Sequence, residues 1–227
     1  MRQLLPSFVD PVDPMEVYAD LPAADGRPGV RLNMIASVDG ATAVDGVAGG
    51  LANQADKDLF HLMRSLADVV MVAAGTVRAE GYGPSKVPIA VVTRSCNLDW
   101  RSRFFTDQDA RPVVVTVATA PAEARARAAE VADVLLAGER DVDLAKAVAA
   151  LGERGWQKVL CEGGPTLNGQ LVAAGLLDEL CMTLSPRLIG GGAKRLLHCP
   201  VLPEPRALRL ASACEEDGFL FLRYRSG

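Results

Sequence analysis

The sequence predicts an α/β domain in which helices cover both faces of a central mixed, mostly parallel β-sheet. Short valine-rich segments that carry almost no charge alternate with segments of helical composition, which is typical of strands buried on both faces. The chain ends in a pair of strand-like segments with the pattern of a hairpin, so part of the sheet is expected to be antiparallel. With 227 residues, of which 49% are apolar and 23% charged, the chain can bury a sizeable core.

The N-terminal part of the chain differs in composition from the rest. Residues 1–29 are rich in Pro, Asp and Ala and contain a Gly-Arg-Pro-Gly turn at residues 26–29. We expect an irregular arm there that crosses the surface, followed by a single domain over residues 30–227.

The first predicted elements flank a glycine-rich loop. Residues 30–37 form an apolar run of strand length that ends at the turn-forming pair Asp39-Gly40. Residues 46–50 contain three glycines and are expected to be a loop. Asn53 is placed to cap a helix over residues 54–66, in which apolar side chains recur on one face.

The remaining elements alternate as this fold class requires. The predicted strands are residues 68–73, 88–93, 112–118, 131–136, 158–161, 178–185, 207–214 and 219–225. The predicted helices are residues 121–130, 143–154 and 166–174. Gly155 suits the position after the second of these helices, and residues 215–218 are expected to form the turn of the final hairpin.

Charge and composition exclude several classes of function. Lys and Arg number 24 against 28 Asp and Glu, so the net charge of -4 leaves no basic excess to hold nucleic acid. No apolar run reaches the roughly 20 residues that span a bilayer, and the N-terminus has no secretory signal, so we expect a cytoplasmic protein with no membrane partner. The 5 cysteines include no C-x-x-C pair and there are 2 histidines, so neither a disulfide framework nor a metal site is expected.

Two junctions between a buried strand and a helix have the features of a ligand-binding turn. In residues 72–78 the strand runs into Gly75-Thr76, and in residues 159–167 it runs into Gly163-Gly164-Pro165. Backbone N–H groups at such helix starts can meet a phosphate without obstruction by side chains. Two such junctions in one chain favour a ligand site, and tight turns without function are the alternative.

Two further segments carry donors for an anion. Thr93, Arg94 and Ser95 end a predicted strand with two hydroxyls and a guanidinium, a donor set that suits the 2′-phosphate of NADPH. Residues 186–195 contain three consecutive glycines followed by basic residues, which suits a loop that closes on an anion. A solvated strand end and a flexible loop are the respective alternatives.

The first predicted strand carries polar groups on one face. Asn33, Ile35 and Ser37 share that face, and Asp39 follows at the mouth of the strand. A buried amide without a partner costs on the order of 1–3 kcal/mol, so Asn33 needs a partner. A ligand is one candidate partner, and an internal network is the other.

Together these segments resemble the reductase domain of the bacterial riboflavin biosynthesis protein and the stand-alone pyrimidine reductases. That family has S-L-D-G at the end of a first strand, then G-x-G-T-V-R, then E-G-G-P-T-L, and a final D-E followed by P-x-L-x-G-G-G. The corresponding segments here are Ser37-Val38-Asp39-Gly40, Ala73-Ala74-Gly75-Thr76-Val77-Arg78, Glu162-Gly163-Gly164-Pro165-Thr166-Leu167, Asp178-Glu179 and Pro186-Arg187-Leu188-Ile189-Gly190-Gly191-Gly192. They match in order and spacing from about residue 30 to the C-terminus.

The resemblance implies a dihydrofolate-reductase-like fold, NADPH as hydride donor, a homodimer and reduction of 5-amino-6-(5-phosphoribosylamino)uracil or a close ribosylaminopyrimidine phosphate to the ribitylamino compound. It implies that the residues lining the cofactor are Gly75, Thr76, Gly163, Gly164, Pro165, Thr166 and Leu167. It also implies that Asn33, Ser37, Asp39 and Glu162 face the pyrimidine and the reacting sugar, with Asp39 as the catalytic residue that orients them.

The sequence departs from the family pattern at three places. The zinc deaminase motifs H-x-E and P-C-x-x-C do not occur, so deamination is not expected. Residues 78–84 replace the D-D-P-x-L-T segment that helps to hold the phosphate end of the substrate in the family. Asn33 stands where the bacterial bifunctional proteins usually have lysine, and an asparagine can accept as well as donate. The pyrimidine is therefore expected to differ at an exocyclic oxygen or amino group.

Two other functions remain as alternatives. The altered segment at residues 78–84 favours a reductase for dihydrofolate or another pterin on the same fold, because fold alone does not decide the substrate. A catalytically silent nucleotide-binding protein is the other alternative, and turnover of NADPH with any pyrimidine or pterin would eliminate it.

Overall fold

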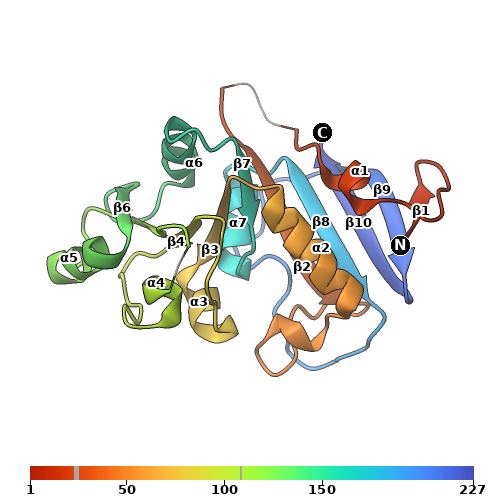
Figure 1. Cartoon of the computed structure of the whole chain (residues 1–227), viewed down its shortest axis with the longest axis horizontal. Helices are drawn as coiled ribbons and strands as arrows, with labels where there is room; N and C mark the ends of the chain where they lie inside the picture. Colours follow the sequence, from red (N-terminus) through yellow and green to blue (C-terminus); the bar gives the residue numbers. More distant parts are fainter. Residues whose placement is uncertain (23–25, 108) are drawn as a thin grey trace.

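The computed structural model describes residues 1–22, 26–107 and 109–227, which form one mixed β-sheet with helices on both faces (Figure 1). The sheet has ten strands in the order β1-β9-β10-β8-β2-β7-β3-β4-β5-β6. The strands are β1 (Arg2–Leu5), β2 (Gly29–Ser37), β3 (Val69–Ala73), β4 (Ile89–Val92), β5 (Val113–Thr116), β6 (Asp133–Leu136), β7 (Lys158–Cys161), β8 (Glu179–Ser185), β9 (Leu208–Glu216) and β10 (Phe219–Ser226).

Parallel pairing runs from β8 through β2, β7, β3, β4 and β5 to β6, whereas β10, β9 and β1 are antiparallel. The prediction of a mixed, mostly parallel sheet is therefore confirmed. The final hairpin is also confirmed, with a tighter turn than expected. Glu216 pairs with Phe219 across Asp217-Gly218, and both turn residues have positive φ (52° and 80°). Asp-Gly is favoured in such two-residue turns, because its backbone twist matches that of the strands.

Helices cover the sheet in two layers. They are α1 (Pro14–Tyr18), α2 (Gln54–Ser65), α3 (Ala74–Glu80), α4 (Arg103–Thr106), α5 (Ala122–Val131), α6 (Leu144–Glu153) and α7 (Pro165–Ala173), with a 3₁₀ turn η1 (Ala48–Gly50). Leu59 and Met63 of α2 pack with Val70 and Val72 of β3, and the same cluster contains residues of α1, α3, α4 and α5. Residues of α6 and α7 pack with the alternate residues of β3, on the opposite face. The sheet is thus the middle of three layers.

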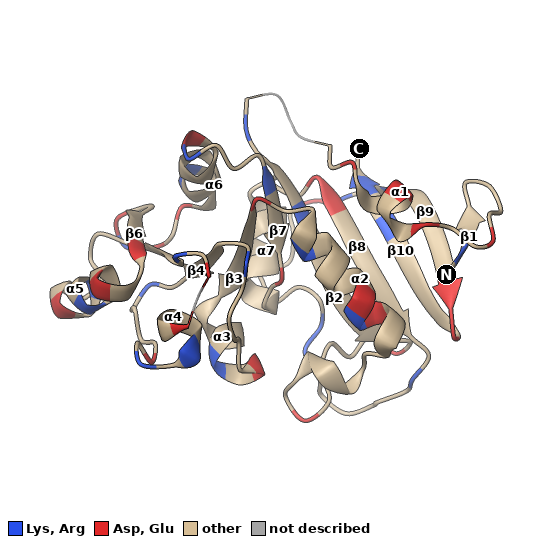
Figure 2. Ribbon diagram, in the orientation of Figure 1, with Lys and Arg blue, Asp and Glu red and all other residues tan. Residues whose placement is uncertain are grey.

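The predicted helix after the glycine-rich loop is confirmed as α2. The side chain of its N-cap Asn53 accepts a hydrogen bond from the N–H of Asp56, as expected for a capping asparagine. The predicted loop at residues 46–50 instead contains η1, and Val44 and Val47 form an isolated bridge just before it. Charged side chains lie mainly on helices and loops around the valine-rich strands (Figure 2).

The expectation of an irregular N-terminal arm was wrong in part. Strand β1 joins the sheet by pairing with β9, and Asp13 caps the short helix α1 by accepting from the N–H of Met15. Residues 23–25 of this arm lie outside the described residues. The pattern was missed because β1 and α1 are short elements that owe their stability to tertiary contacts.

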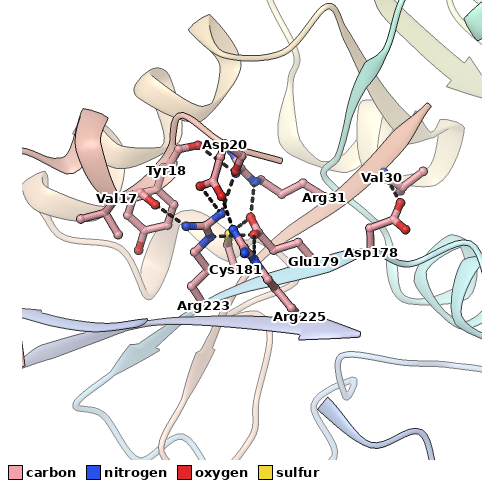
Figure 3. Close-up of polar contacts among 10 residues, drawn as sticks. All are labelled: Val17, Tyr18, Asp20, Val30, Arg31, Asp178, Glu179, Cys181, Arg223 and Arg225. Carbon is pink, nitrogen blue, oxygen red and sulfur yellow. Dashed lines mark hydrogen bonds and ion pairs between the residues drawn. The ribbon is translucent and has the colours of Figure 1, made fainter. Parts of the chain in front are cut away.

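A buried ionic network holds the segment after α1 against the sheet (Figure 3). Glu179 at the start of β8 is fully buried and pairs with Arg31 of β2 and Arg223 of β10, at 2.6 Å in both cases. The two guanidinium groups also donate to the carbonyl oxygen of Asp20, at 2.7 Å each. The arm therefore satisfies donors that would otherwise be buried without partners.

Candidate active site

A cavity of about 900 Å³ opens at the carboxyl ends of β2, β3 and β7. In open α/β sheets this edge is where ligands bind, because loops and helix starts converge there. One wall is formed by the turns after β3 and β7. Residues from 42–49 and from 189–194 of the loop after β8 form another part of the wall. Helix α2 contributes a third side, and residues 33–35 of β2 also line the cavity.

The two predicted glycine turns meet in this cavity. Gly75, Thr76, Gly164, Pro165 and Thr166 line it. The turns touch, because a Cβ atom added to Gly164 would lie 2.8 Å from the hydroxyl oxygen of Thr76. This close approach leaves room for backbone only, so the turns form a cradle without bulky side chains.

The other residues of the second turn stand behind the cradle. Gly163 has a φ of +86° and a cis peptide bond to Gly164, and its carbonyl oxygen accepts from the N–H of Ala73 at 2.7 Å. Leu167 is buried in the core between α7 and the sheet. Neither residue lines the cavity.

Glu162, predicted to face the substrate, lines the cavity but is already paired. Arg64 donates to both carboxylate oxygens at 2.7 Å, and the hydroxyl of Tyr82 donates to one of them at 2.6 Å. The Arg64 guanidinium also lies 4.4 Å from the centroid of the Phe60 ring. Burial and the neighbouring Glu162 raise the pKa of Tyr82, so its hydroxyl stays protonated as a donor.

Sequence reasoning missed a stripe of cavity residues on α2. Asp56, Phe60 and Arg64 follow one another at intervals of four and all line the cavity. Burial raises the pKa of Asp56, and a hydrogen bond with the Thr183 side chain opposes that shift. The signal was the placement of a carboxylate, a ring and a guanidinium on one helical face, beside the apolar face that packs on the sheet.

Of the polar residues on and just after β2, Asn33 lines the cavity, whereas Ser37 and Asp39 do not. Asn33 is half-buried and lines the cavity. Ser37 is buried, and its hydroxyl donates to Asp39 while accepting from the N–H of Ala41. Asp39 is exposed and is not among the cavity-lining residues.

Asp39 instead holds the glycine-rich loop after β8. Its carboxylate accepts from the N–H groups of Ile189 at 3.1 Å and Gly190 at 2.6 Å. The Ser37 hydroxyl and these backbone N–H groups lower the pKa of Asp39 from 3.8 to about 2. Lys194 lies further along the loop, and its carbonyl oxygen accepts from both the N–H and the hydroxyl of Thr42. The loop is therefore fixed at two points as a wall of the cavity.

The predicted phosphate-binding triplet lies outside the cavity, at the carboxyl end of β4. Thr93 is buried, and its hydroxyl accepts from the N–H of Cys96. Arg94 and Ser95 are exposed. Arg94 pairs with Asp141 at 2.9 Å, but both side chains are at least 70% exposed, so the pair is weak and the guanidinium is available to another anion.

The described residues give little support for a metal site, a reactive thiol or a membrane span. Within residues 1–22, 26–107 and 109–227, no group of three or more His, Cys, Asp or Glu side chains is placed to hold a metal ion. Burial raises the pKa of the Cys161 thiol to about 12, so it stays protonated and unreactive. No helix in this part of the chain is long and apolar enough to cross a bilayer.

Comparison with known proteins gives a consistent result. The model of the RibD C-terminal domain family matches residues 28–217. The 2,5-diamino-6-ribosylamino-4(3H)-pyrimidinone 5′-phosphate reductase of Methanothermobacter thermautotrophicus is 31% identical over 181 residues, which are 75% of this chain and 83% of the relative. The protein of the same name from Archaeoglobus fulgidus is 30% identical over 185 residues, with coverage of 73% and 83%. The crystal structure of a pyrimidine reductase-like protein from Corynebacterium diphtheriae superposes with a TM-score of 0.80 at 26% identity, covering 94% of this chain and 98% of that one.

Proposed function

This chain belongs to the RibD C-terminal domain family, and from that membership we propose that it is a reductase which uses NADPH to convert a ribosylaminopyrimidine 5′-phosphate to the ribitylamino compound. The observation that carries the proposal is the convergence of the two glycine turns on the cavity that also holds Asn33 and Asp56. A cofactor cradle and polar groups for a heterocycle thus face one space of sufficient size.

The substrate favoured here is 2,5-diamino-6-ribosylamino-4(3H)-pyrimidinone 5′-phosphate, rather than the uracil compound expected first. The relatives at 30–31% identity carry the name of a reductase for that pyrimidinone. This pyrimidinone has an amino group where the uracil has an oxygen. Asn33 can accept a hydrogen bond from that amino group, whereas a lysine at the same position can only donate.

The residues of the two turns fit a nicotinamide cofactor. The cradle between Thr76 and Gly164 admits no Cβ atom, and Pro165 and Thr166 begin helix α7, whose free N–H groups suit a phosphate. The bound nicotinamide would supply a hydride to C1′ of the ring-opened sugar imine. The protein's own part is to position the two ligands and to exclude water.

Asp56 is the group best placed to deliver the proton that the imine nitrogen needs. It lines the cavity, and burial raises its pKa, so the protonated form persists to higher pH than in water. Glu162 is a weaker candidate for direct contact, because Arg64 and Tyr82 occupy its oxygens. We assign Glu162 the role of fixing these two side chains in the cavity wall.

Discrimination between NADPH and NADH is assigned to Arg94, with Thr93 and Ser95 at the same strand end. The exposed Arg94 can exchange Asp141 for a 2′-phosphate at little cost. Replacement of Arg94 by Ala should reduce the preference for NADPH over NADH about tenfold or more in kcat/KM, with the NADH value unchanged. Equal values for the two cofactors in the unaltered protein would refute the assignment.

We also propose that residues 30–227 form a single reductase domain and that the protein is a homodimer. The face of β8 and β10 opposite α2 carries half-buried apolar side chains such as Met182, Leu222 and Tyr224, which a second copy can cover. Sedimentation equilibrium distinguishes a monomer of 24.0 kDa from a particle of twice that mass.

The proposal is tested by NADPH oxidation at saturating cofactor with three substrates in parallel: the diaminopyrimidinone phosphate, 5-amino-6-(5-phosphoribosylamino)uracil and dihydrofolate. We expect the highest kcat/KM for the diaminopyrimidinone. Dihydrofolate remains the second candidate, because Glu80, Gly81 and Tyr82 replace the D-D-P segment and Tyr82 contacts Glu162. Turnover of dihydrofolate alone would establish that alternative, and binding of NADPH without any turnover would indicate a silent protein.

A further inference from the structure

The side chains that line the cavity include more acidic than basic groups. Among the described residues that line it, the acidic side chains are Asp45, Asp56, Glu80 and Glu162, and the cations are Arg64 and Lys194. Arg64 is engaged by both oxygens of Glu162. Lys194 forms no ion pair with any residue that the structure describes. Apart from the turns that would hold the cofactor phosphates, Lys194 is therefore the described charged group of the wall that is available to attract a dianion.

The backbone presents Lys194 at a fixed position. Thr42 is 6% exposed, and both its N–H and its hydroxyl donate to the Lys194 carbonyl oxygen, at 3.2 and 2.8 Å. Asp39 holds the same loop at Ile189 and Gly190. Between these two anchors the loop residues that line the cavity are Gly192 and Ala193, so no large side chain separates the lysine from the space.

We propose that Lys194 binds the 5′-phosphate of the substrate and thereby selects phosphorylated over unphosphorylated ribosylaminopyrimidines. This inference rests on the function proposed above. A lysine ammonium is a compact charge with three donors, which suits the rotating oxygens of a phosphate monoester. Lys194 and the cofactor turns line the same cavity. A substrate bound in this cavity can thus direct its sugar to the nicotinamide and its phosphate to Lys194.

The test compares the phosphorylated substrate with its dephosphorylated riboside in the unaltered protein and in Lys194→Ala. We expect KM for the phosphate ester to rise about tenfold or more in the variant, while KM for the riboside changes less than about twofold. Lys194→Arg, which keeps the charge, should retain most of the affinity. Arg195→Ala is the matched control, because Arg195 is exposed, adjacent and not part of the cavity lining.

A second readout does not depend on turnover. Inorganic phosphate at tens of millimolar should raise Tm of the unaltered protein and of Arg195→Ala, but not that of Lys194→Ala, because a ligand that binds the folded state stabilises it. Equal phosphate shifts in all three proteins, or equal KM changes for ester and riboside, would overturn the assignment of Lys194. Absence of turnover by the unaltered protein, together with a phosphate shift lost only in Lys194→Ala, would refute the proposed function and leave the anion site standing. An effect of Lys194→Ala confined to dihydrofolate would assign the lysine to a carboxylate tail instead.

Discussion

At the scale of single residues, Asp39 shows how a carboxylate can shape a cavity that it does not line. It accepts from two backbone N–H groups of the loop that carries Lys194. We expect Asp39→Asn to raise KM for the substrate about tenfold, with a smaller change in kcat, because the loop loses charge-assisted hydrogen bonds. Asp107→Asn, which removes an exposed carboxylate after α4 that does not line the cavity, should leave both constants unchanged.

The depressed pKa of Asp39 also sets a pH limit. A carboxyl whose folded pKa is lowered from 3.8 to about 2 favours the folded loop at any pH above its unfolded value, and this contribution disappears as pH falls toward 2. The loop contact should therefore persist unchanged from pH 5 to 8. A KM that varied over this range in the unaltered protein but not in Asp39→Asn would contradict this account.

The pKa of Asp56 is shifted upward, opposite to that of Asp39, and this shift predicts a pH dependence of the activity. Its pKa is raised by burial, so the protonated form is available below the shifted value and is lost above it. If Asp56 supplies the proton, kcat/KM should be level at low pH and then fall about tenfold per pH unit above that pKa. Asp56→Asn should lower kcat by 100-fold or more, on the order of a general acid's contribution, and remove this limb of the profile. A limb that survives in the variant would assign the proton transfer to another group.

At the scale of elements, the contact between the turns after β3 and β7 is the most restrictive feature of the cradle. A Cβ at Gly164 would meet the Thr76 hydroxyl at 2.8 Å, whereas one at Gly75 would meet only the end of Arg78 at 3.9 Å. Gly164→Ala should therefore weaken NADPH binding about tenfold or more, and Gly75→Ala should have a smaller effect, as measured by fluorescence titration. The double variant Gly164→Ala/Thr76→Ala should recover part of the loss if the collision is its cause.

The elements that sequence predicted are those whose signals are local. The valine-rich strands, α2 with its Asn53 cap and the Asp-Gly hairpin follow from periodicity, capping and turn chemistry. The short elements β1, α1, η1 and α4 were not predicted, because segments of three to five residues carry too few repeats for a period to appear. Their positions depend on distant partners, such as β9 for β1.

The candidate site was predictable to a similar degree. Both glycine turns and Asn33 were found from sequence and line the cavity, because strand ends and glycine turns are local features. Arg64 and Tyr82 were missed, since their shared role depends on Glu162, which is 80 residues or more away from both. Phe60, which contacts Arg64, was missed with them. The separation of Asp39 from the cavity likewise depends on a loop 150 residues further along the chain.

At the scale of the whole molecule, Glu179 joins three strands and the N-terminal arm. It is fully buried and pairs with Arg31 and Arg223, and Arg225 lies 3.4 Å from it. Glu179→Gln leaves the buried Arg31 guanidinium without its ion-pair partner, so we expect a loss of about 3–5 kcal/mol in the free energy of unfolding, measured by urea titration. Glu123→Gln, at an exposed pair on α5, should change it by less than about 0.5 kcal/mol. A similar small loss at Glu179 would show that the network does not hold the arm.

Strand β1 lies at one edge of the sheet, and its pairing has to wait until its partner strand has been synthesised. Arg2 of β1 pairs with Glu215 of β9, 213 residues further on. At a synthesis rate of about 5–20 residues per second, the first strand has to wait about 10–40 s on the ribosome before its partner exists. During that interval its unpaired edge and exposed Leu4 and Leu5 are open to other chains. Strand β1 thus waits longer for its partner than the other described strands of the sheet.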